Sequence, residues 1–492
     1  MLHPIEKYLV GAGLVFACFI SNSCPCAAQT ATEVIHAAQN QEALRSATIG
    51  FYAINLTNDK VIGSYNADTS ITPASALKIL TTATALEVLG PNHRFTTTIQ
   101  HDGQIDAQGT LRGNIYIKGG GDPMLGSSRF KQHYYAPYFI DTWVKAIKAK
   151  GIQRIVGAVV GDATIYTDYD VVPSTWVVGD LGMYYGAVVS GLSIFDNTFS
   201  VKLQAPSQGQ AASLVAVTPA LPPEVQLMLQ VHGADIKHAA LYNVGYPYTK
   251  VRTIIGSIPC APKVSHTQVT IPDAAYWAAY TLQQALRQQG VEVVQAATTM
   301  RRGEQSKLPR NHLYTTCSPT LGQLLKAINL DSVNSYAEHL VKHLGRVLAE
   351  EASTQEGIKT IRKFWAKCGI NVNGMFLYDG SGLSRYNALT PKQLVEVLCR
   401  MKHSNHFSVF YHSLPVAGKT GRLIHPMLKK PPLYGRLRIK SGRLSRCRTF
   451  VGYGKNKRNE DIAFALFIVN YDSQAKADEA LEQILTAMVQ QE

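Results

Sequence analysis

Apolar residues near the start of the chain recur at the spacing of an α-helix. Four leucines define this pattern: Leu77, Leu80, Leu86 and Leu89. Thr72 suits the capping position and Pro73 the first helical position, while Gly90 and the proline after it end the pattern. The pattern therefore predicts a buried helix that begins at Pro73, with Ser75 and Lys78 in its first two turns.

Alternating apolar and polar residues predict strands towards both ends of the chain. Residues 47–56 and 61–65 are expected to form a hairpin around Asn58 and Asp59, after a short polar helix at about 32–45. Three further strands are expected at 436–439, 449–453 and 463–470, and a last helix at about 475–490. Helices are expected between them, at 321–329, 335–348, 356–368 and 391–400. These elements predict an α/β sandwich.

The pattern changes at about Phe95 and returns only after residue 305. Strands at 96–100 and 114–118, a helix at about 138–150 and a strand at 154–160 come first. Residues 165–264 are strand-like and interrupted by proline, and a helix at 274–289 with a strand at 291–296 follows. We expect three nested domains, namely 29–95 with 306–492, 96–164 with 265–305, and a mainly β domain at 165–264. The chain is long enough for several cores.

Composition and the N-terminal residues indicate what class of protein this is and where it is located. Its 492 residues are 46% hydrophobic and 17% charged, as in folded proteins, and carry a net charge of +14. Lys7 precedes an apolar stretch at 8–20, and small residues surround a cut after Ala28, so residues 1–28 predict a signal peptide. An uncut anchor, or lipid on Cys18 or Cys24, are the alternatives. The positive net charge predicts anionic surroundings. Because export to the periplasm or cell envelope is expected, these are a membrane face or an acidic polymer, and no nucleic acid partner is expected.

Cysteines and histidines show no metal or disulfide pattern. Five widely spaced cysteines remain after residue 28, and mostly buried free thiols are expected: Cys260, Cys317, Cys368, Cys399 and Cys447. His339 and His343 lie one helical turn apart, but a third ligand is not evident. We expect neither a metal nor a cofactor. The glycine triplet at 119–121 lacks the lysine and hydroxyl residue of a phosphate loop, so a tight turn is expected.

Three short motifs could together form a site for nucleophilic catalysis. Ser75 and Lys78 are three residues apart on one helix face, so the amine can take the hydroxyl proton. Ser332 and Asn334 lie in a polar break between two helices. The third motif has two candidates, Lys419-Thr420-Gly421 and Lys440-Ser441-Gly442. We favour Lys440, because it ends a strand-like run and two strands follow it, whereas Lys419 leads into a loop.

With these motifs the chain resembles the class C, type-4 penicillin-binding proteins, the D-alanyl-D-alanine carboxypeptidases and endopeptidases of peptidase family S13. Three further stretches carry the resemblance: 113–123, Asp379–Arg385 and Leu414–Gly418. The resemblance covers nearly all of the chain after residue 28. It implies a serine transpeptidase-like (β-lactamase-like) α/β domain, in which helices flank an antiparallel sheet, with a nested insertion of two smaller domains.

The resemblance also implies a role for each motif residue. Ser75 is the acylated nucleophile and Lys78 its base, while Ser332 with Lys78 passes the proton to the leaving amine. Asn334 binds the substrate backbone. The third motif, Lys440, Ser441 and Gly442, binds the substrate carboxylate, and the backbone N–H groups of Ser75 and Arg443 form an oxyanion hole.

Asp180, Tyr185 and Arg385 match the residues with which relatives bind a diaminopimelate side chain. The sequence departs from the family at Val333 and at three arginines: Arg443, Arg446 and Arg448.

The expected function is an exported serine DD-peptidase that hydrolyses D-alanyl-D-alanine and cross-link bonds of peptidoglycan. Its expected partners are peptidoglycan stem peptides, with β-lactam antibiotics as acylating inhibitors; peripheral association with the membrane or wall stays open. A serine β-lactamase and a non-catalytic wall-binding protein are the alternatives. A basic cluster that includes Lys429, Lys430, Arg436 and Arg438 could bind an anionic polymer, although a solvated face is the default.

Overall fold

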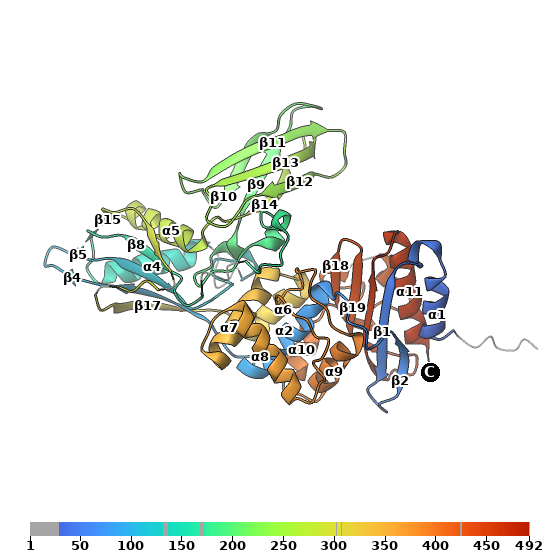
Figure 1. Cartoon of the computed structure of the whole chain (residues 1–492). Coiled ribbons are helices and arrows are strands. Elements are labelled where there is room, and N and C mark those ends of the chain that lie inside the picture. Colours follow the sequence, from blue (N-terminus) through green and yellow to red (C-terminus); the bar gives the residue numbers. More distant parts are fainter. Residues whose placement is uncertain are drawn as a thin grey trace, which may run out of the picture.

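The computed structural model describes residues 29–130, 136–167, 172–301, 303–306, 308–423 and 426–491. The predicted signal peptide, with Cys18, Cys24 and Cys26, lies outside the described residues. Figure 1 shows a main body that contains both ends of the described chain, from which the middle of the chain extends as two further bodies.

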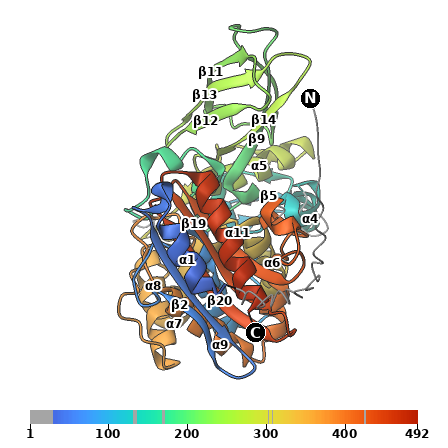
Figure 2. The same ribbon diagram turned by 90° about the vertical axis from the view of Figure 1, so that its right-hand side faces the viewer.

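A five-stranded antiparallel sheet, in the order β18-β19-β20-β1-β2, forms the centre of the main body. Its strands are β1 (Thr48–Asn55), β2 (Val61–Tyr65), β18 (Leu437–Leu444), β19 (Cys447–Lys455) and β20 (Asp461–Val469). β20 is buried along nearly its whole length, because helices cover both faces of the sheet. α1 (Ala31–Gln39) and α11 (Gln474–Gln490) pack side by side on one face (Figure 2).

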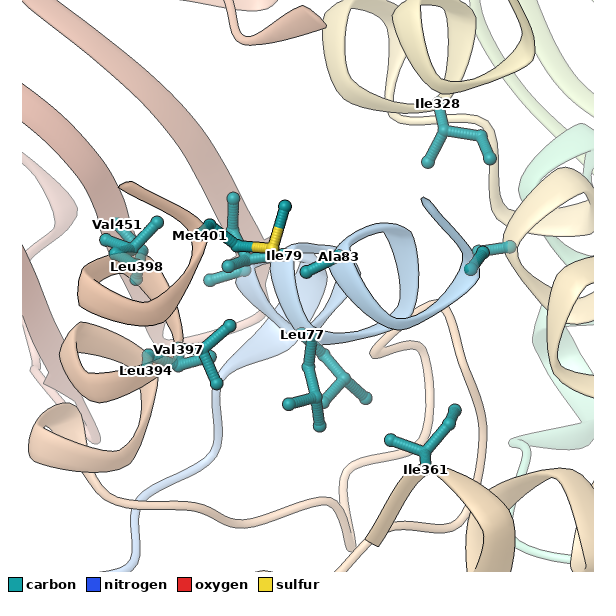
Figure 3. Packing of buried hydrophobic residues seen from close by; sticks show 14 of the residues in the cluster. Leu77, Ile79, Ala83, Ile328, Ile361, Leu394, Val397, Leu398, Met401 and Val451 are labelled. Carbon is teal, nitrogen blue, oxygen red and sulfur yellow. The ribbon is translucent and has the colours of Figure 1, made fainter. Parts of the chain in front are cut away.

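The other face of the sheet is covered by a group of helices around α2 (Lys78–Leu89). The others are α6 (Leu321–Asp331), α7 (Asn334–Ala349), α8 (Thr354–Lys367), α9 (Pro391–Lys402) and α10 (Phe407–Ser413). Residues 78–86 of α2 are all buried, the burial expected of a helix that is surrounded by others. Figure 3 shows Leu77, Ile79 and Ala83 packed among Ile328, Ile361, Met401 and Val451.

The start of α2 differs from the sequence prediction. Residues Ala74–Leu77 form a 3₁₀ turn, Pro73 occupies the position before it, and the α-helix begins only at Lys78. Ala74 has a φ of 47°, in the left-handed region, which no helix interior accommodates. Ser75 therefore lies in a tight turn ahead of the helix, and Lys78 is the first residue of the helix itself.

The described residues of the first inserted body form two sheets and two helices. One sheet has the order β16-β8-β6-β3-β17 and the other β15-β7-β5-β4, and α4 (Ala136–Ala149) and α5 (Ala274–Gln288) pack against each other. The strands of the first sheet are β3 (Thr96–His101), β6 (Ile115–Gly119), β8 (Val159–Asp162), β16 (Thr298–Met300) and β17 (Asn311–Cys317). Those of the second are β4 (Gln104–Ile105), β5 (Thr110–Arg112), β7 (Arg154–Ile155) and β15 (Glu292–Val293).

The second inserted body is mainly β, and it lies above the first in Figure 1. Among the described residues, three short 3₁₀ turns precede it, at Val178–Asp180, Tyr184–Gly186 and Phe195–Asn197. Two three-stranded sheets follow, in the orders β10-β9-β14 and β11-β13-β12. Their strands are β9 (Thr198–Gln204), β10 (Ser213–Thr218), β11 (Gln226–Ala234), β12 (Ala240–Val244), β13 (Val251–Pro259) and β14 (Ser265–Thr270).

Strand pairing moves two of the predicted domain boundaries. β14 pairs with β9, so the mainly β part continues to residue 270 rather than 264. β17 pairs with β3, so the first inserted body continues to residue 317 rather than 305. Both strands lie at the edge of their sheets, where side chains are more polar than in central strands, so the sequence gives them a weak signal.

The five described cysteines are free, but the prediction that most are buried is wrong. Cys447 alone among them is buried, and Cys317 is exposed. Cys260, Cys368 and Cys399 have intermediate exposure.

Candidate active site

The turn that carries Ser75 lies against β18 and β19 and is enclosed by two glycines. A Cβ at Gly442 of β18 would stand 2.9 Å from the backbone nitrogen of Ser75 and 2.1 Å from Thr449 Oγ1. On the other side, a Cβ at Gly382 would stand 1.9 Å from the carbonyl oxygen of Ala74. The hydroxyl of Thr449 donates a hydrogen bond to the carbonyl oxygen of Pro73, at 2.7 Å. Because neither glycine has a side chain, the segments that carry Gly442 and Gly382 can both approach the Ser75 turn closely.

Lys78 joins the serine to two other segments of the chain. Its side chain is fully buried, and Nζ lies 3.1 Å from Ser75 Oγ, 2.6 Å from Asn334 Oδ1 and 2.7 Å from the carbonyl oxygen of Ser381. A protonated amine donates to all three oxygens. A neutral amine can instead accept the Ser75 proton while its two hydrogens bond to Asn334 and Ser381. The arrangement therefore accommodates both protonation states.

Ser332 and Asn334 come from the junction between α6 and α7. Ser332 ends α6 in the left-handed conformation, with a φ of 57°, and Asn334 is the first residue of α7. Ser332 Oγ accepts a hydrogen bond from Lys440 Nζ at 3.0 Å. Asn334 Nδ2 donates to the carbonyl oxygen of Tyr185 at 2.8 Å. An inserted segment of the chain thus helps to fix a side chain of the site.

Of the two candidate lysines of the third motif, Lys440 is the one beside Ser332. It lies in β18, is 1% exposed, and also donates to the carbonyl oxygen of Ser441 at 2.7 Å. Lys419 is exposed in a turn, and its Nζ lies 5.1 Å from the centre of the Tyr434 ring. It lines a separate hollow with Gly435 and Arg436.

A buried carboxylate supports the contact between Lys78 and Ser381. Glu338 of α7 accepts hydrogen bonds from the backbone N–H groups of Gly380 and Ser381, the latter at 2.7 Å. Burial, and then the nearby carboxylate of Asp379, raise the pKa of Glu338 to about 7. The motifs gave no indication of Glu338, because its partners are backbone groups of a loop distant in the sequence.

A cleft of about 820 Å³ opens in front of Ser75, Ser332 and Asn334. All three residues predicted to bind a diaminopimelate side chain line it: Asp180, Tyr185 and Arg385. The Tyr185 hydroxyl donates to Asp180 Oδ1 at 3.1 Å, and burial and the Asp180 charge raise the pKa of this phenol. Arg443 also lines the cleft, directly after Ser441 and Gly442 on β18.

Sequence reasoning missed the ion pairs of two arginines that line the same cleft, Arg129 and Arg446. Arg129 comes from the first inserted body and lies 3.3 Å from Asp331 and 3.5 Å from Asp196. Arg446 lies 3.1 Å from Asp472. These residues belong to no short motif, and only the fold brings them to the cleft.

His339 and His343 both lie buried on α7. His339 Nδ1 donates to the carbonyl oxygen of Ser335 at 2.7 Å, and its Nε2 lies 2.9 Å from Ser193 Oγ. Within the described ranges, no group of three or more His, Cys, Asp or Glu side chains could hold a metal ion. A search of the same ranges finds no helix with the length and apolar character needed to span a membrane.

Residues 31–491 match the D-Ala-D-Ala carboxypeptidase 3 (S13) family. The chain belongs to this family. It is 26% identical over 444 residues to D-alanyl-D-alanine carboxypeptidase DacB of Haemophilus influenzae, covering 88% of each chain. A D-alanyl-D-alanine carboxypeptidase of an Actinomadura species is 25% identical over 459 residues, covering 88% of this chain and 80% of that one.

Solved structures show the same fold. The crystal structure of penicillin binding protein 4 from Haemophilus influenzae superposes with a TM-score of 0.77 at 24% identity, over 92% of this chain and 97% of that one. A complex of the same protein with a β-lactam gives a TM-score of 0.74 at 23% identity, over 93% and 99% of the two chains. The predicted family and the predicted serine transpeptidase-like fold are thereby confirmed.

Proposed function

We propose that this protein is a serine DD-peptidase that hydrolyses the D-alanyl-D-alanine end of peptidoglycan stem peptides, and cross-link peptide bonds, through an acyl-enzyme on Ser75. The observation that carries the proposal is the position of Lys78 Nζ, which lies within hydrogen-bond distance of Ser75 Oγ and Asn334 Oδ1. A nucleophile beside a buried amine is the arrangement that activates a serine hydroxyl without a histidine. The family supports the same reaction.

The reaction then proceeds in two steps. Neutral Lys78 accepts the Ser75 proton as Oγ attacks the carbonyl carbon of the scissile bond, and the oxyanion is stabilised by the backbone N–H groups of Ser75 and Arg443. The proton passes through Ser332 to the leaving D-alanine amine, and the C–N bond breaks. Water next attacks the acyl-enzyme, releases the shortened peptide and returns the proton to Ser75.

Two parts of the site bind the substrate, namely the third motif on β18 and the side chain of Asn334. Lys440 with Ser441 and Gly442 binds the terminal carboxylate, because an ammonium group at a strand edge pairs with such a charge. Asn334 Nδ2 binds the substrate backbone.

We also propose that Asp180, Tyr185 and Arg385 bind a side chain that ends in both an ammonium and a carboxylate group. Asp180 would pair with the ammonium and Arg385 with the carboxylate. Their positions around the cleft support this assignment.

Labelled penicillin distinguishes the proposal from its two alternatives. A stable covalent adduct that is lost in Ser75→Ala supports the peptidase, whereas rapid turnover of penicillin would identify a β-lactamase. Absence of labelling in the intact protein would identify a wall-binding protein. Release of D-alanine from a defined muropeptide then establishes the substrate.

A matched pair of variants tests the choice of lysine. Lys440→Ala should reduce penicillin acylation by about a hundredfold or more, because it removes a charge that binds the carboxylate. Lys419→Ala should leave acylation unchanged. The reverse result would contradict the assignment.

The proposal also includes three nested domains and export of the protein. Strand pairing supports a peptidase domain at 31–95 and 318–491, a second domain at 96–164 and 271–317, and a third at 165–270. Export to the periplasm or cell envelope places the enzyme beside peptidoglycan. N-terminal sequencing of the protein from an envelope fraction should give Gln29 as the first residue, whereas Met1 would contradict cleavage.

A further inference from the structure

A second hollow, of about 280 Å³, lies between the peptidase helices and the first inserted body. It shares no lining residue with the cleft in front of Ser75. α7 contributes His343 and Arg346, the segment before β3 contributes His93 and Arg94, and β6 contributes Lys118. The hollow therefore joins two parts of the chain that are separate bodies.

The lining of this hollow is positively charged. Arg94, Lys118 and Arg346 lie along it, and the lining residues that the structure describes include no aspartate or glutamate. In the part of the chain that the structure describes, neither Lys118 nor Arg346 has a carboxylate within 4.0 Å. Three cations that line one concave site produce a positive potential there, which favours an anion.

An independent feature of the hollow is a buried histidine with unused hydrogen-bonding atoms. His343 is 3% exposed, and neither ring nitrogen has a partner among the described residues. His93 Nε2 is likewise buried without a partner, and the centres of the two rings are 4.9 Å apart. Buried polar atoms are normally hydrogen-bonded, so unpaired nitrogens beside an open hollow indicate a missing acceptor.

We propose that this hollow binds a phosphate group. A phosphate dianion matches three cations better than a single carboxylate does, and its several oxygens can accept from guanidinium, ammonium and imidazole donors together. The volume accommodates the phosphate and the first atoms attached to it. Both free phosphate and the phosphate of a lipid headgroup have this chemistry.

The glycines that line the hollow allow close packing of the backbone. Gly119 and Gly120 line the hollow, and a Cβ at Gly120 would stand 2.1 Å from the carbonyl oxygen of Thr96. Gly120 thus lets the end of β6 lie close to Thr96, the first residue of β3, while side chains supply the charge. A bound phosphate would contact both bodies and hold them together.

Calorimetry on the full-length protein tests the site, with inorganic phosphate as the titrant and chloride at the same ionic strength as the reference. Wild type should bind phosphate, and Arg346→Gln should weaken binding about tenfold, the loss expected for one charged hydrogen bond. Lys118→Gln should act in the same direction. Lys363→Gln, which removes an exposed charge from α8 outside the hollow, should bind as wild type does.

Vesicles of neutral lipid with and without phosphatidic acid distinguish the source of the phosphate. Binding to acidic vesicles that is lost in Arg346→Gln but not in Lys363→Gln, without binding of inorganic phosphate, identifies a lipid headgroup. Labelling by penicillin should be unchanged in every variant, which shows that the fold is intact. Failure of wild type to bind either probe, or equal binding by Arg346→Gln and wild type, would overturn the proposal.

Discussion

The amine of Lys78, the proposed base, depends on a residue that does not contact Ser75. Glu338 fixes the loop whose Ser381 carbonyl oxygen accepts from Lys78 Nζ, because its carboxylate accepts from two consecutive N–H groups of that loop. A glutamine has one acceptor oxygen and presents an NH₂ group where the second oxygen was. Glu338 is therefore a positioning residue for Lys78.

Glu338→Gln should slow acylation by labelled penicillin about tenfold, because one charged hydrogen bond in the support is lost. Acylation by wild type should rise with pH around 7, where Glu338 ionises, and this rise should be weaker in the variant. Glu356→Gln is the control, because this half-buried carboxylate of α8 pairs with Lys359 and not with the loop that carries Ser381. An identical pH profile for Glu338→Gln and wild type would contradict the positioning role.

Two buried histidines should make the protein less stable in acid. Burial lowers the pKa of His339 to about 4 and of His343 to about 3. The unfolded chain takes up these protons near pH 6.5 and the folded chain does not, so stability is lost as the pH falls from 6.5 towards 4. The raised pKa of Glu338 acts in the opposite sense, since it lowers stability as the pH rises from 4.5 to 7.

Replacing one histidine isolates its contribution. Between pH 7.5 and 5, wild type should lose about 2 kcal/mol more than His339→Gln, which corresponds to about 5 °C in the midpoint of thermal unfolding. The comparison cancels the contribution of Glu338, which both proteins retain. Equal losses in the two proteins would show that His339 does not titrate differently on unfolding.

Among the elements, β18 is the strand that approaches the reactive turn most closely. Gly442→Ala would place a methyl group 2.1 Å from Thr449 Oγ1 and 2.7 Å from the carbonyl oxygen of Pro73, so the turn must move away from the strand. We expect at least about a hundredfold loss of acylation, because the proposed oxyanion donors and the proposed nucleophile are displaced together.

Gly322→Ala is the matched control for Gly442→Ala. In α6 its methyl group would meet nothing closer than Val409 Cγ1 at 3.3 Å, and alanine favours a helix. Circular dichroism should show a folded chain in both variants. Normal acylation by Gly442→Ala would mean that the turn tolerates a wider spacing.

The elements also show where sequence patterns succeed and fail. The strands of the central sheet alternate or are wholly apolar, so their existence was predictable, although β18 is longer than expected. β17 was missed because it is a polar edge strand, and α10 because it has only seven residues. The start of α2 was assigned to Pro73 by a cap rule, whereas contact with β18 and β19 imposes a 3₁₀ turn there.

The candidate site was predictable to the extent that it consists of short motifs. Ser75 and Lys78 share one local segment, so helical spacing alone places them together. Ser332 and Lys440 required the family resemblance, because they are 108 positions apart. Glu338 and Arg129 carry no motif and meet their partners only through the tertiary fold.

For the whole molecule, the inserted segments complete the site. The Tyr185 carbonyl oxygen accepts from Asn334, and Trp176 Nε1 donates to Asp379 Oδ2 at 2.9 Å. Trp176 also packs against Leu383, beside Gly382. The inserted segment therefore contacts both the loop that carries Ser381 and the side-chain amide of Asn334, the two groups that bind Lys78 Nζ.

Trp176→Phe should reduce acylation about fivefold and lower stability by about 2 kcal/mol, since it removes a hydrogen bond to a buried carboxylate. Trp143→Phe is the control, because it loses a hydrogen bond to Thr316 Oγ1 at 2.8 Å within the first inserted body. That variant should lose stability but retain acylation. If both variants acylate normally, the insert does not support the site through Trp176.

The hydrogen bond from Lys78 to Asn334 joins residues 256 positions apart. A chain that is still being synthesised, or is threaded unfolded through a membrane, therefore has its serine but neither of the distant groups that would orient the amine and bind a substrate carboxylate. Folding itself acts as the activation step.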